Sequence, residues 1–547
     1  MTRNFVSTGP RLVALALLLL TAALPAVQAA AKLELVPKWD RFEHAFKSSV
    51  AYANAVQEVV LKVVFTSPLG EATEVEAFWD GGRTWRVRFS PDQPGRWSFR
   101  ATCSDTANAG LHNQAGEFLC SAPIGMNPFR LHGPVRVARN HRHLEHADGT
   151  PFFWLADTVW DGARVAESRD WDFYAVTRAR QGFTVAQWSV APGEDARSQS
   201  AWTGSLERIA INPDFFQRLD ARIGVLARAG LMSAIAPLLE LQWSAGAAAL
   251  PDSQAELLVR YIVARWGAEP VVWMLAFESD ASASNLGRWK RIGQAVFGDR
   301  PRAPVVLFPG QTQWLLDEFR DEKWVDAFGY QSVTDVSDDA LMWTVSGPFT
   351  TEWRKEPARP LIAFVPCENG AAPRSARRFG AADVRRAACW SLLLAPPAGI
   401  SYCAEGLMNW DGTVGPRTAG ETRGSGLPLW REALFLPGAE QVSHLAKFMD
   451  SIDYGALRPR ARIVASQPGS QSPQRFIAGA GTDPNTLSVV YVPVDRTVEL
   501  SPAALPASPL VGWFNPRTGV RQAVTARGAR FTTPAPGDWL LLIQASR

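Results

Sequence analysis

An alternation of apolar and helical segments, repeated eight times between residues 152 and 402, constrains the fold more than any other feature of the chain. The apolar segments are short and nearly continuous, which is typical of strands buried on both faces of a parallel sheet. One intervening helix is well delimited, because Asn212 is placed to cap it, Pro213 suits its first turn and Gly230 suits its end. The predicted strands are residues 152–156, 183–188, 231–239, 271–277, 305–308, 324–330, 361–365 and 399–402.

Eight strand–helix units over roughly 300 residues predict a (β/α)8 barrel, the TIM-barrel architecture. The alternative is an open doubly wound sheet, but no glycine-rich dinucleotide loop follows any predicted strand. Short strands with turn signals come before and after this region, for example an alternating run at 74–79. We therefore predict a multidomain α/β plus all-β chain, with an Ig-like β-sandwich at residues 31–125, the barrel at 126–452 and a C-terminal β-sandwich at 453–547.

The first 30 residues have the three-part layout of a secretory signal peptide. Arg3 and Arg11 precede an apolar run at 12–20, and three alanines at 29–31 provide small residues for cleavage. The apolar run is short for a membrane span, although an uncleaved anchor helix is the alternative. We expect the mature chain to be secreted or periplasmic, without a membrane span.

The charge balance and the cysteines exclude several classes of function. The chain has 56 basic and 53 acidic residues, so its net charge of +3 lacks the positive excess of a nucleic-acid-binding protein. No Cys/His cluster has metal-ligand spacing, and we predict neither a metal nor a cofactor. In an oxidising compartment Cys103 and Cys120 could form a disulfide, with two buried thiols as the alternative. Cys367, Cys389 and Cys403 are expected to be buried apolar residues.

Polar residues at the ends of the predicted strands form the candidate site, since barrel enzymes carry their sites at the carboxyl ends of the strands. Glu278 follows strand 271–277 directly, and Glu368 lies just beyond strand 361–365. Cleavage of a glycosidic bond needs two carboxyl groups at one cleft. The alternative is that these acids form salt bridges at the barrel rim, which for Asp157 is as good an explanation as substrate binding. The residues expected to bind substrate are Asp157, Trp160, Gln187, Trp188, Glu240, Trp243, Asp280, Gln331, Tyr402, Glu405 and Trp410.

Several motifs carry a family resemblance: 153–160, 181–187, 212–216, 265–266, 272–275, 330–332 and 399–402 in the barrel, and 513–519 and 538–541 in the tail. In these motifs the chain is similar to the apiosidase-like (β/α)8 glycoside hydrolases. The preceding β-sandwich resembles the domain that often comes before these barrels, and the tail resembles a β module named for collagen binding. The resemblance implies an acid/base carboxylate at the end of strand four, which is Glu278 here, and a nucleophilic carboxylate at the end of strand seven, which is Glu368.

We therefore predict a secreted glycoside hydrolase that cleaves a plant or microbial polysaccharide, or its side chains, with Glu278 and Glu368 as the catalytic pair. Retention of configuration is expected, because two glutamates from strands four and seven should approach to the roughly 5–5.5 Å of a double-displacement enzyme. The alternative from another class is a non-catalytic carbohydrate- or matrix-binding protein with a degenerate barrel.

Overall fold

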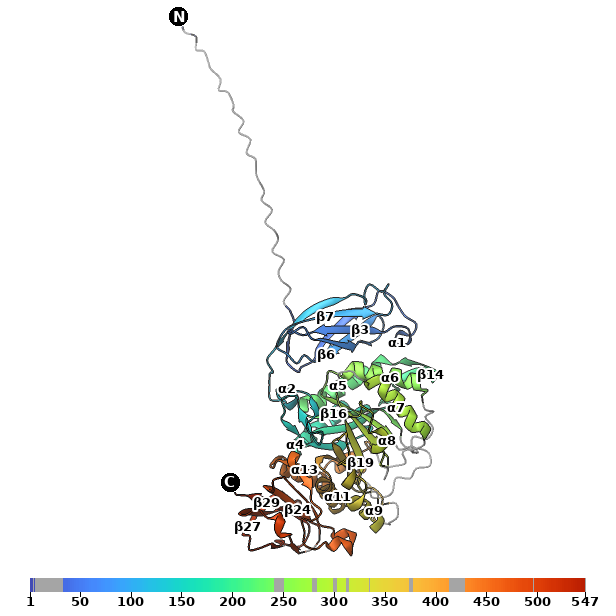
Figure 1. Cartoon of the computed structure of the whole chain (residues 1–547). Helices are drawn as coiled ribbons and strands as arrows, with labels where there is room; N and C mark the ends of the chain where they lie inside the picture. The colour runs from blue at the N-terminus through green and yellow to red at the C-terminus, as the bar shows by residue number, and fades with distance from the viewer. Residues whose placement is uncertain are drawn as a thin grey trace.

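The chain forms an N-terminal β-sandwich, a central barrel and a C-terminal β module, in sequence order (Figure 1). The predicted fold class, a (β/α)8 barrel between two β domains, is confirmed. The computed structural model describes residues 1–2, 4, 33–240, 250–277, 283–298, 303–310, 314–333, 335–372, 377–412, 428–494 and 496–546.

The N-terminal part is a sandwich of a five-stranded and a three-stranded sheet. Phenylalanine rings fill the space between the two sheets: Phe42 stacks on Phe118 with ring centroids 4.1 Å apart, and Phe65 stacks on Phe89 at 4.2 Å. Such rings remove a large apolar area from water, which suits a domain of this size. The sheets are, in strand order, β1 (Leu35–Pro37), β8 (Ala115–Ser121), β7 (Gly95–Cys103), β3 (Leu61–Thr66) and β4 (Ala72–Glu76), and β2 (Phe42–Lys47), β6 (Thr84–Phe89) and β5 (Phe78–Trp79).

The central part is a closed barrel of eight strands, in which every neighbouring pair is parallel. The barrel closes where the first strand pairs with the eighth, with Trp154 opposite Gly399. In order, the strands are β12 (Trp154–Thr158), β13 (Val185–Ala191), β16 (Met232–Glu240), β17 (Val271–Phe277), β18 (Val305–Pro309), β19 (Ala327–Gln331), β20 (Leu361–Phe364) and β21 (Pro397–Cys403).

Helices surround the barrel strands (Figure 1). The helix predicted from residue 213 has the expected ends: Asn212 accepts a hydrogen bond from the backbone N–H of Phe215, and Gly230 takes a left-handed φ of 81°. The long helices are α4 (Ser168–Arg180), α5 (Pro213–Ala229), α6 (Asp252–Trp266), α7 (Ala283–Phe297), α9 (Asp338–Ser346), α11 (Ala381–Leu394) and α13 (Pro437–Asp450). Short elements are α1 (Ala55–Glu58), α2 (Pro128–Leu131), α3 (Gly162–Val165), α8 (Leu316–Phe319), α10 (Phe349–Glu352), α12 (Trp430–Ala433), β9 (Val135–Val137), β10 (Leu144–His146), β11 (Pro151–Phe152), β14 (Trp202–Ser205) and β15 (Arg208–Ile211).

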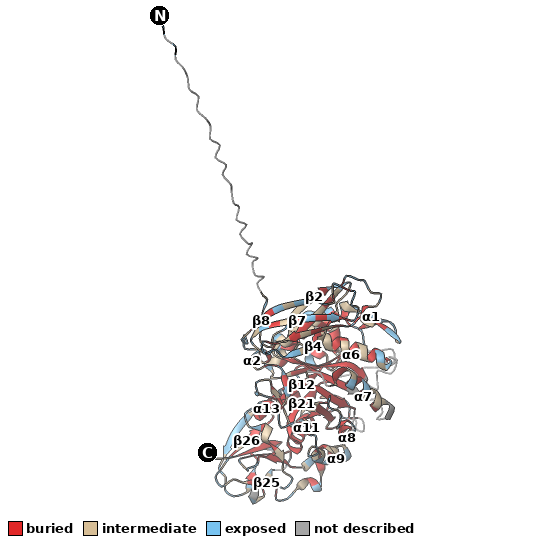
Figure 2. Ribbon diagram, turned by 45° about the horizontal axis from the view of Figure 1, so that its top comes forward, coloured by how far each residue is buried: buried red, intermediate tan, exposed pale blue. Residues whose placement is uncertain are grey.

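Side chains of the barrel strands alternate between two apolar clusters, and most are buried (Figure 2). One cluster takes alternate residues from all eight strands, such as Ala156 and Met274, and therefore fills the barrel interior. The other takes the residues between them, such as Leu155 and Leu275, together with the helices. Cluster membership therefore shows whether a strand residue faces the interior or the helices.

The C-terminal part is a six-stranded sheet with a two-stranded sheet beside it. A buried ion pair ties it to the barrel: Arg385 of α11 donates to both carboxylate oxygens of Asp538 at 2.8 Å. The six-stranded sheet has the order β22 (Arg458–Pro459), β23 (Ala478–Gly481), β24 (Leu487–Val492), β29 (Trp539–Ala545), β26 (Pro509–Asn515) and β27 (Val520–Val524), and the smaller sheet pairs β25 (Thr497–Glu499) with β28 (Arg530–Thr532).

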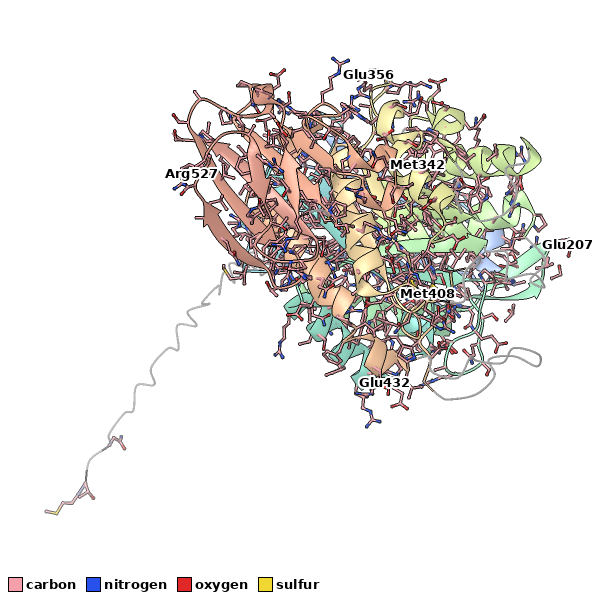
Figure 3. The ribbon with its side chains drawn as sticks, turned by 90° about the horizontal axis from the view of Figure 1, so that it is seen from below. Glu207, Met342, Glu356, Met408, Glu432 and Arg527 are labelled. Carbon is pink, nitrogen blue, oxygen red and sulfur yellow. A yellow bond between two sulfur atoms is a disulfide. The ribbon has the colours of Figure 1, made fainter. Side chains whose placement is uncertain are left out.

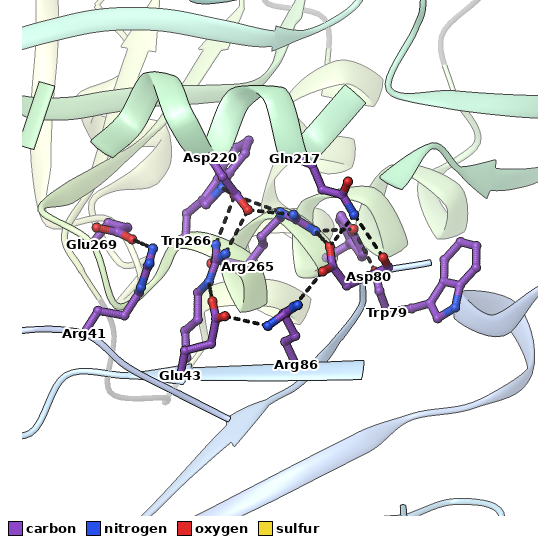
Figure 4. A network of polar contacts seen from close by, with 12 residues as sticks. Arg41, Glu43, Trp79, Asp80, Arg86, Gln217, Asp220, Arg265, Trp266 and Glu269 are labelled. Carbon is purple, nitrogen blue, oxygen red and sulfur yellow. Dashed lines mark hydrogen bonds and ion pairs between the residues drawn. The ribbon is translucent and has the colours of Figure 1, made fainter. Parts of the chain in front are cut away.

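A charged network joins the N-terminal sandwich to the barrel (Figure 4). Asp220 of α5 accepts from Arg265 of α6 and from Arg88 of β6, with shortest distances of 2.7 and 2.8 Å. Arg265 also pairs with Asp80 at 2.9 Å, and Arg88 pairs with Glu43 at 2.7 Å. The two arginine side chains are only 1% and 5% exposed, so each buried cation has two carboxylate partners.

Of the two alternatives for Cys103 and Cys120 the structure shows the buried free thiols, and Cys389 is buried and free as expected, but the expectation of free buried residues at Cys367 and Cys403 is wrong. These two cysteines form a disulfide. Cys120 lies opposite Gly95, at the far end of β7 from Cys103, because antiparallel neighbours bring opposite ends together. Cys367 follows β20, and Cys403 ends its parallel neighbour β21. The two cysteines therefore meet at the carboxyl ends of these strands, with Cα atoms 4.4 Å apart.

Within the part of the chain that the structure describes, no helix combines the length and the apolar character that crossing a bilayer requires.

Candidate active site

The carboxyl ends of the barrel strands present aromatic rings to the interior. Trp160 follows β12, Phe308 lies in β18 and Phe364 ends β20, and all three belong to the interior cluster. The rings of Phe308 and Phe364 stack with centroids 3.8 Å apart, and Trp160 stacks on Phe308 at 6.4 Å. We call these three residues the aromatic floor of the mouth.

A glycine makes room for the aromatic floor. A Cβ atom on Gly329, in the middle of β19, would lie 2.6 Å from the Phe364 ring and 3.2 Å from the Phe308 ring. A side chain at this position would therefore displace both rings. Two residues further along the same face of β19 is Gln331, which is partly exposed. Its side chain is thereby placed beside the aromatic floor.

Polar groups of the first two strands lie next to the floor. Thr158 donates to the amide oxygen of Gln187 at 3.3 Å, and the amide nitrogen of Gln187 faces the sulfur of Met274 at 3.4 Å. A thioether is a weak acceptor, so the Gln187 N–H group keeps most of its hydrogen-bonding capacity. Ser189, on the same face, donates to the backbone oxygen of Trp160 at 3.0 Å. The structure therefore brings Trp160 and the partly exposed Gln331 to the mouth, whereas Gln187 faces the barrel interior and is fully buried. Contact of all three residues with substrate stays a prediction.

Asp157 and Trp188 lie on the other side of the barrel wall. The Asp157 carboxylate is fully buried and accepts from Arg178 of α4 at 2.8 and 3.3 Å. Trp188 packs against Trp266 of α6, with ring centroids 5.7 Å apart. Because each residue alternates with an interior one along its strand, each faces the helices. Both side chains therefore pack between the strands and the helices, and their contact with a substrate stays a prediction.

Trp410 and Tyr402 are also part of the layer between strands and helices. The Trp410 ring stacks on Trp430 at 4.3 Å and lies 5.7 Å from the ring of Trp171 in α4. Tyr402 is fully buried in the same outer cluster. In this structure these two residues pack in the wall of the barrel, and their contact with a substrate stays a prediction.

Glu368 does not face the mouth. Its side chain is 2% exposed and accepts a hydrogen bond from the Tyr402 hydroxyl at 2.5 Å. The backbone N–H of Gly438, in the first turn of α13, donates to both carboxylate oxygens at 3.0 and 3.2 Å. Burial raises the pKa of this carboxyl above its usual value. The chain continues past β20 before reaching Glu368, so the side chain lies between β21 and α13, away from the aromatic floor. Its assignment as the nucleophile stays a prediction.

Several predicted residues cannot be placed. Glu278, Asp280 and Trp243 lie outside the described residues, although Glu278 directly follows β17. Glu240 ends β16, and its side chain is also outside the description. Glu405 lies two residues beyond β21, is partly exposed, and donates its backbone N–H to the Glu368 carbonyl at 2.9 Å.

Two features of the mouth were missed by the sequence reasoning. Phe308 and Phe364 were treated as ordinary strand residues, although their place at the last inward position of two strands was a usable signal. The disulfide was missed because two cysteines 36 residues apart carry no local signal. Met408, whose sulfur lies 3.5 Å from that of Cys403, is seen over the barrel in Figure 3, away from the C-terminal strands near Arg527.

A family model described as "Apiosidase-like, catalytic domain" matches residues 138–455, which is more than half of the chain. The chain belongs to the apiosidase-like family. A second model, a domain of unknown function named DUF5060, matches residues 35–104 in the N-terminal sandwich. No curated protein matches the chain at a significant level.

Solved structures share the fold of this apiosidase-like protein. A putative glycoside hydrolase from Bacteroides vulgatus is 18% identical, with a TM-score of 0.69 over 93% of this chain and 99% of that one. A family 5 glycoside hydrolase from the same organism is 18% identical, with a TM-score of 0.67 over 77% and 94%. A further structure described as a glycoside hydrolase is 20% identical, with a TM-score of 0.66 over 77% and 99%. Family and fold together identify the chain as a glycoside hydrolase.

Proposed function

We propose that this apiosidase-like protein is an exported enzyme that hydrolyses a glycosidic bond of a plant or microbial polysaccharide at the carboxyl-terminal mouth of its barrel. The observation that carries the proposal is the aromatic floor at the carboxyl ends of the strands, beside the partly exposed amide group of Gln331. Flat apolar rings accommodate the C–H face of a sugar, and amide groups hydrogen-bond its hydroxyls. Export is supported by the signal-peptide pattern of the first 30 residues.

We assign the proton transfer to Glu278. It directly follows β17, whose last described inward residue before the mouth is Met274 of the interior cluster. In a glycoside hydrolase the acid that protonates the leaving oxygen is a carboxyl group. Hydrolysis of this kind needs carboxyl groups and water, and no cofactor.

Cleavage of a glycosidic bond needs a second carboxyl group besides that of Glu278. Among inward strand-end residues whose side chains the structure describes, none is an aspartate or glutamate. The predicted double displacement through Glu368 would require its carboxylate to leave both Tyr402 and Gly438. Following the anomeric proton of the first-formed product by NMR tests that mechanism, and inversion would exclude it.

Turnover of purified protein on a panel of plant cell-wall and microbial glycans tests the function. We expect wild-type protein to release a sugar, and Glu278→Gln to lower kcat by roughly 10²–10⁴ with an unchanged melting temperature. Glu207→Gln is the matched control, because Glu207 is exposed at the edge of the molecule (Figure 3). Its replacement should not change kcat. A Glu278→Gln variant with wild-type kcat would remove Glu278 from the mechanism.

A second candidate function is saccharide binding without turnover, which the apolar strand ends at the mouth favour. In that case the same glycans would bind to wild-type protein without product, and Trp160→Ala would abolish binding while Glu278→Gln would not. Calorimetric titration beside the activity panel separates the two candidates.

A further inference from the structure

Beyond β20 the strand pairing of the barrel resumes at an isolated bridge at Glu368. Glu368 forms a parallel bridge with Ala404, its backbone N–H donates to Cys403 at 2.9 Å, and its carbonyl accepts from Glu405 at 2.9 Å. The disulfide between Cys367 and Cys403 lies beside this bridge. The rim of the mouth is thus held at the ends of strands seven and eight by backbone and covalent links.

The Glu368 side chain extends this rim to helix α13. One carboxylate joins Tyr402 of β21 to Gly438, whose N–H is among the first-turn groups that have no partner within a helix. A Cβ atom on Gly438 would lie 2.2 Å from Oε2 of Glu368, so only glycine permits the contact. A negatively charged acceptor is also favoured at the start of a helix of this length, 14 residues.

Charged groups face the carboxylate from neighbouring elements. Arg178 of α4 is fully buried, pairs with Asp157 of β12 and donates to the carbonyl of Leu434, just before α13, at 2.9 Å. Arg385 of α11 also attracts Glu368, although it pairs with Asp538. These cations compensate part of the cost of a buried carboxylate.

We propose that Glu368 is a positioning residue whose carboxylate clamps β21 to the start of α13 and thereby holds the disulfide-bearing rim of the mouth. Nothing in this role requires contact with the sugar. The effect on turnover rests on the proposed function, whereas the effect on the rim does not.

Two variants break the clamp in different ways. Glu368→Ala removes the carboxylate, and Gly438→Ala leaves it in place but inserts a methyl group where it binds. We expect both to speed hydrogen–deuterium exchange at residues 399–405 and reduction of the Cys367–Cys403 disulfide by dithiothreitol, each by about tenfold or more, as loss of a charge-assisted hydrogen bond implies. Thiol labelling followed by mass spectrometry measures the reduction. Glu440→Gln, an exposed change on the same helix, is the matched control.

The two changes should also be non-additive, because the methyl group that Gly438→Ala adds fits the space that Glu368→Ala vacates. Glu368→Gln keeps an acceptor for both donors and should restore slow exchange, slow reduction and most of the turnover. Unchanged exchange and reduction in both Glu368→Ala and Gly438→Ala would overturn the proposal.

A nucleophilic Glu368 gives the opposite result. Glu368→Gln would then be inactive with an intact rim, and azide would restore turnover of Glu368→Ala with formation of a glycosyl azide. If wild-type protein turns over no glycan, the proposed function fails, but exchange and disulfide reduction still decide on the clamp.

Discussion

The buried pair of Asp157 and Arg178 is the clearest charge interaction at the scale of single residues, since neither side chain has any exposed surface. A buried pair is costly to break, because the remaining charge loses both its partner and water. Arg178 also holds the carbonyl of Leu434, so its position sets the approach to α13. Asp157 is therefore a structural residue.

We predict that Asp157→Asn destabilises the protein by about 3–5 kcal/mol without raising KM for any substrate. Replacing both partners with apolar residues of similar size, Asp157→Leu with Arg178→Met, should recover most of that stability. Urea unfolding measures both, with the exposed Asp172→Asn on α4 as the control. A raised KM at unchanged stability would return Asp157 to the substrate site.

Glu368 predicts a particular dependence of stability on pH. Its pKa is raised by burial above the unfolded value of about 4.3, so the folded protein binds this proton more tightly than the unfolded chain. Its stabilising contribution is therefore complete below about pH 4.3 and is lost as the pH rises through the raised pKa. The melting temperature of wild type relative to Glu368→Gln should fall from acid toward neutral pH. A difference that grows with pH would show the pKa to be lowered instead.

At the scale of elements, β19 is shaped by the aromatic rings packed over it. We predict that Gly329→Ala destabilises the barrel by about 1–3 kcal/mol through overpacking and changes the fluorescence of Trp160, which stacks on Phe308. Thermal unfolding and emission spectra measure the two effects. Gly412→Ala is a suitable control, because no atom of the residues that the structure describes lies within 4 Å of the added methyl group.

The strands and their order could be predicted because continuous apolar runs and well-capped helices are local signals, as at Asn212 and Gly230. The direction of a side chain at a strand end is harder to predict from the sequence, because consecutive residues of a strand face the interior and the helix layer in turn. Trp188 and Gln187 are neighbours in sequence, yet only Gln187 faces the barrel interior. The direction of the Glu368 side chain is hard to predict for a related reason, because a segment past the strand end does not keep the strand's alternation. Pairing of Cys367 with Cys403 depends on which strands are neighbours, which only the closed barrel establishes.

At the scale of the whole molecule, Asp220 is the centre of the joint between sandwich and barrel (Figure 4). Arg88 comes from the sandwich and Arg265 from the barrel, and both contact this carboxylate. The sandwich and the barrel are therefore expected to unfold together, since separating them would leave buried charges without their partners.

We predict that Asp220→Asn lowers stability at neutral pH and separates the unfolding of the sandwich from that of the barrel. Hydrogen bonds from both arginines lower the pKa of Asp220 to about 2. The stability it provides is present above about pH 4 and is lost as the pH falls toward about 2. Calorimetry should show that the difference in stability between wild type and variant becomes smaller as the pH falls. A stability difference that does not change with pH would mean that the charge of Asp220 plays no part in joining the sandwich to the barrel.

The closure of the barrel sets a condition on how the chain can be made. Trp154 donates a hydrogen bond to Ser401 across a separation of 247 residues, at 3.0 Å. Until the segment near residue 403 has been synthesised, the first strand has no partner on one side and the sheet has two open edges. Contacts this distant in sequence form slowly. The same condition means that no fragment ending before β21 can contain a finished barrel, so a catalytic core cannot be obtained by trimming the chain there.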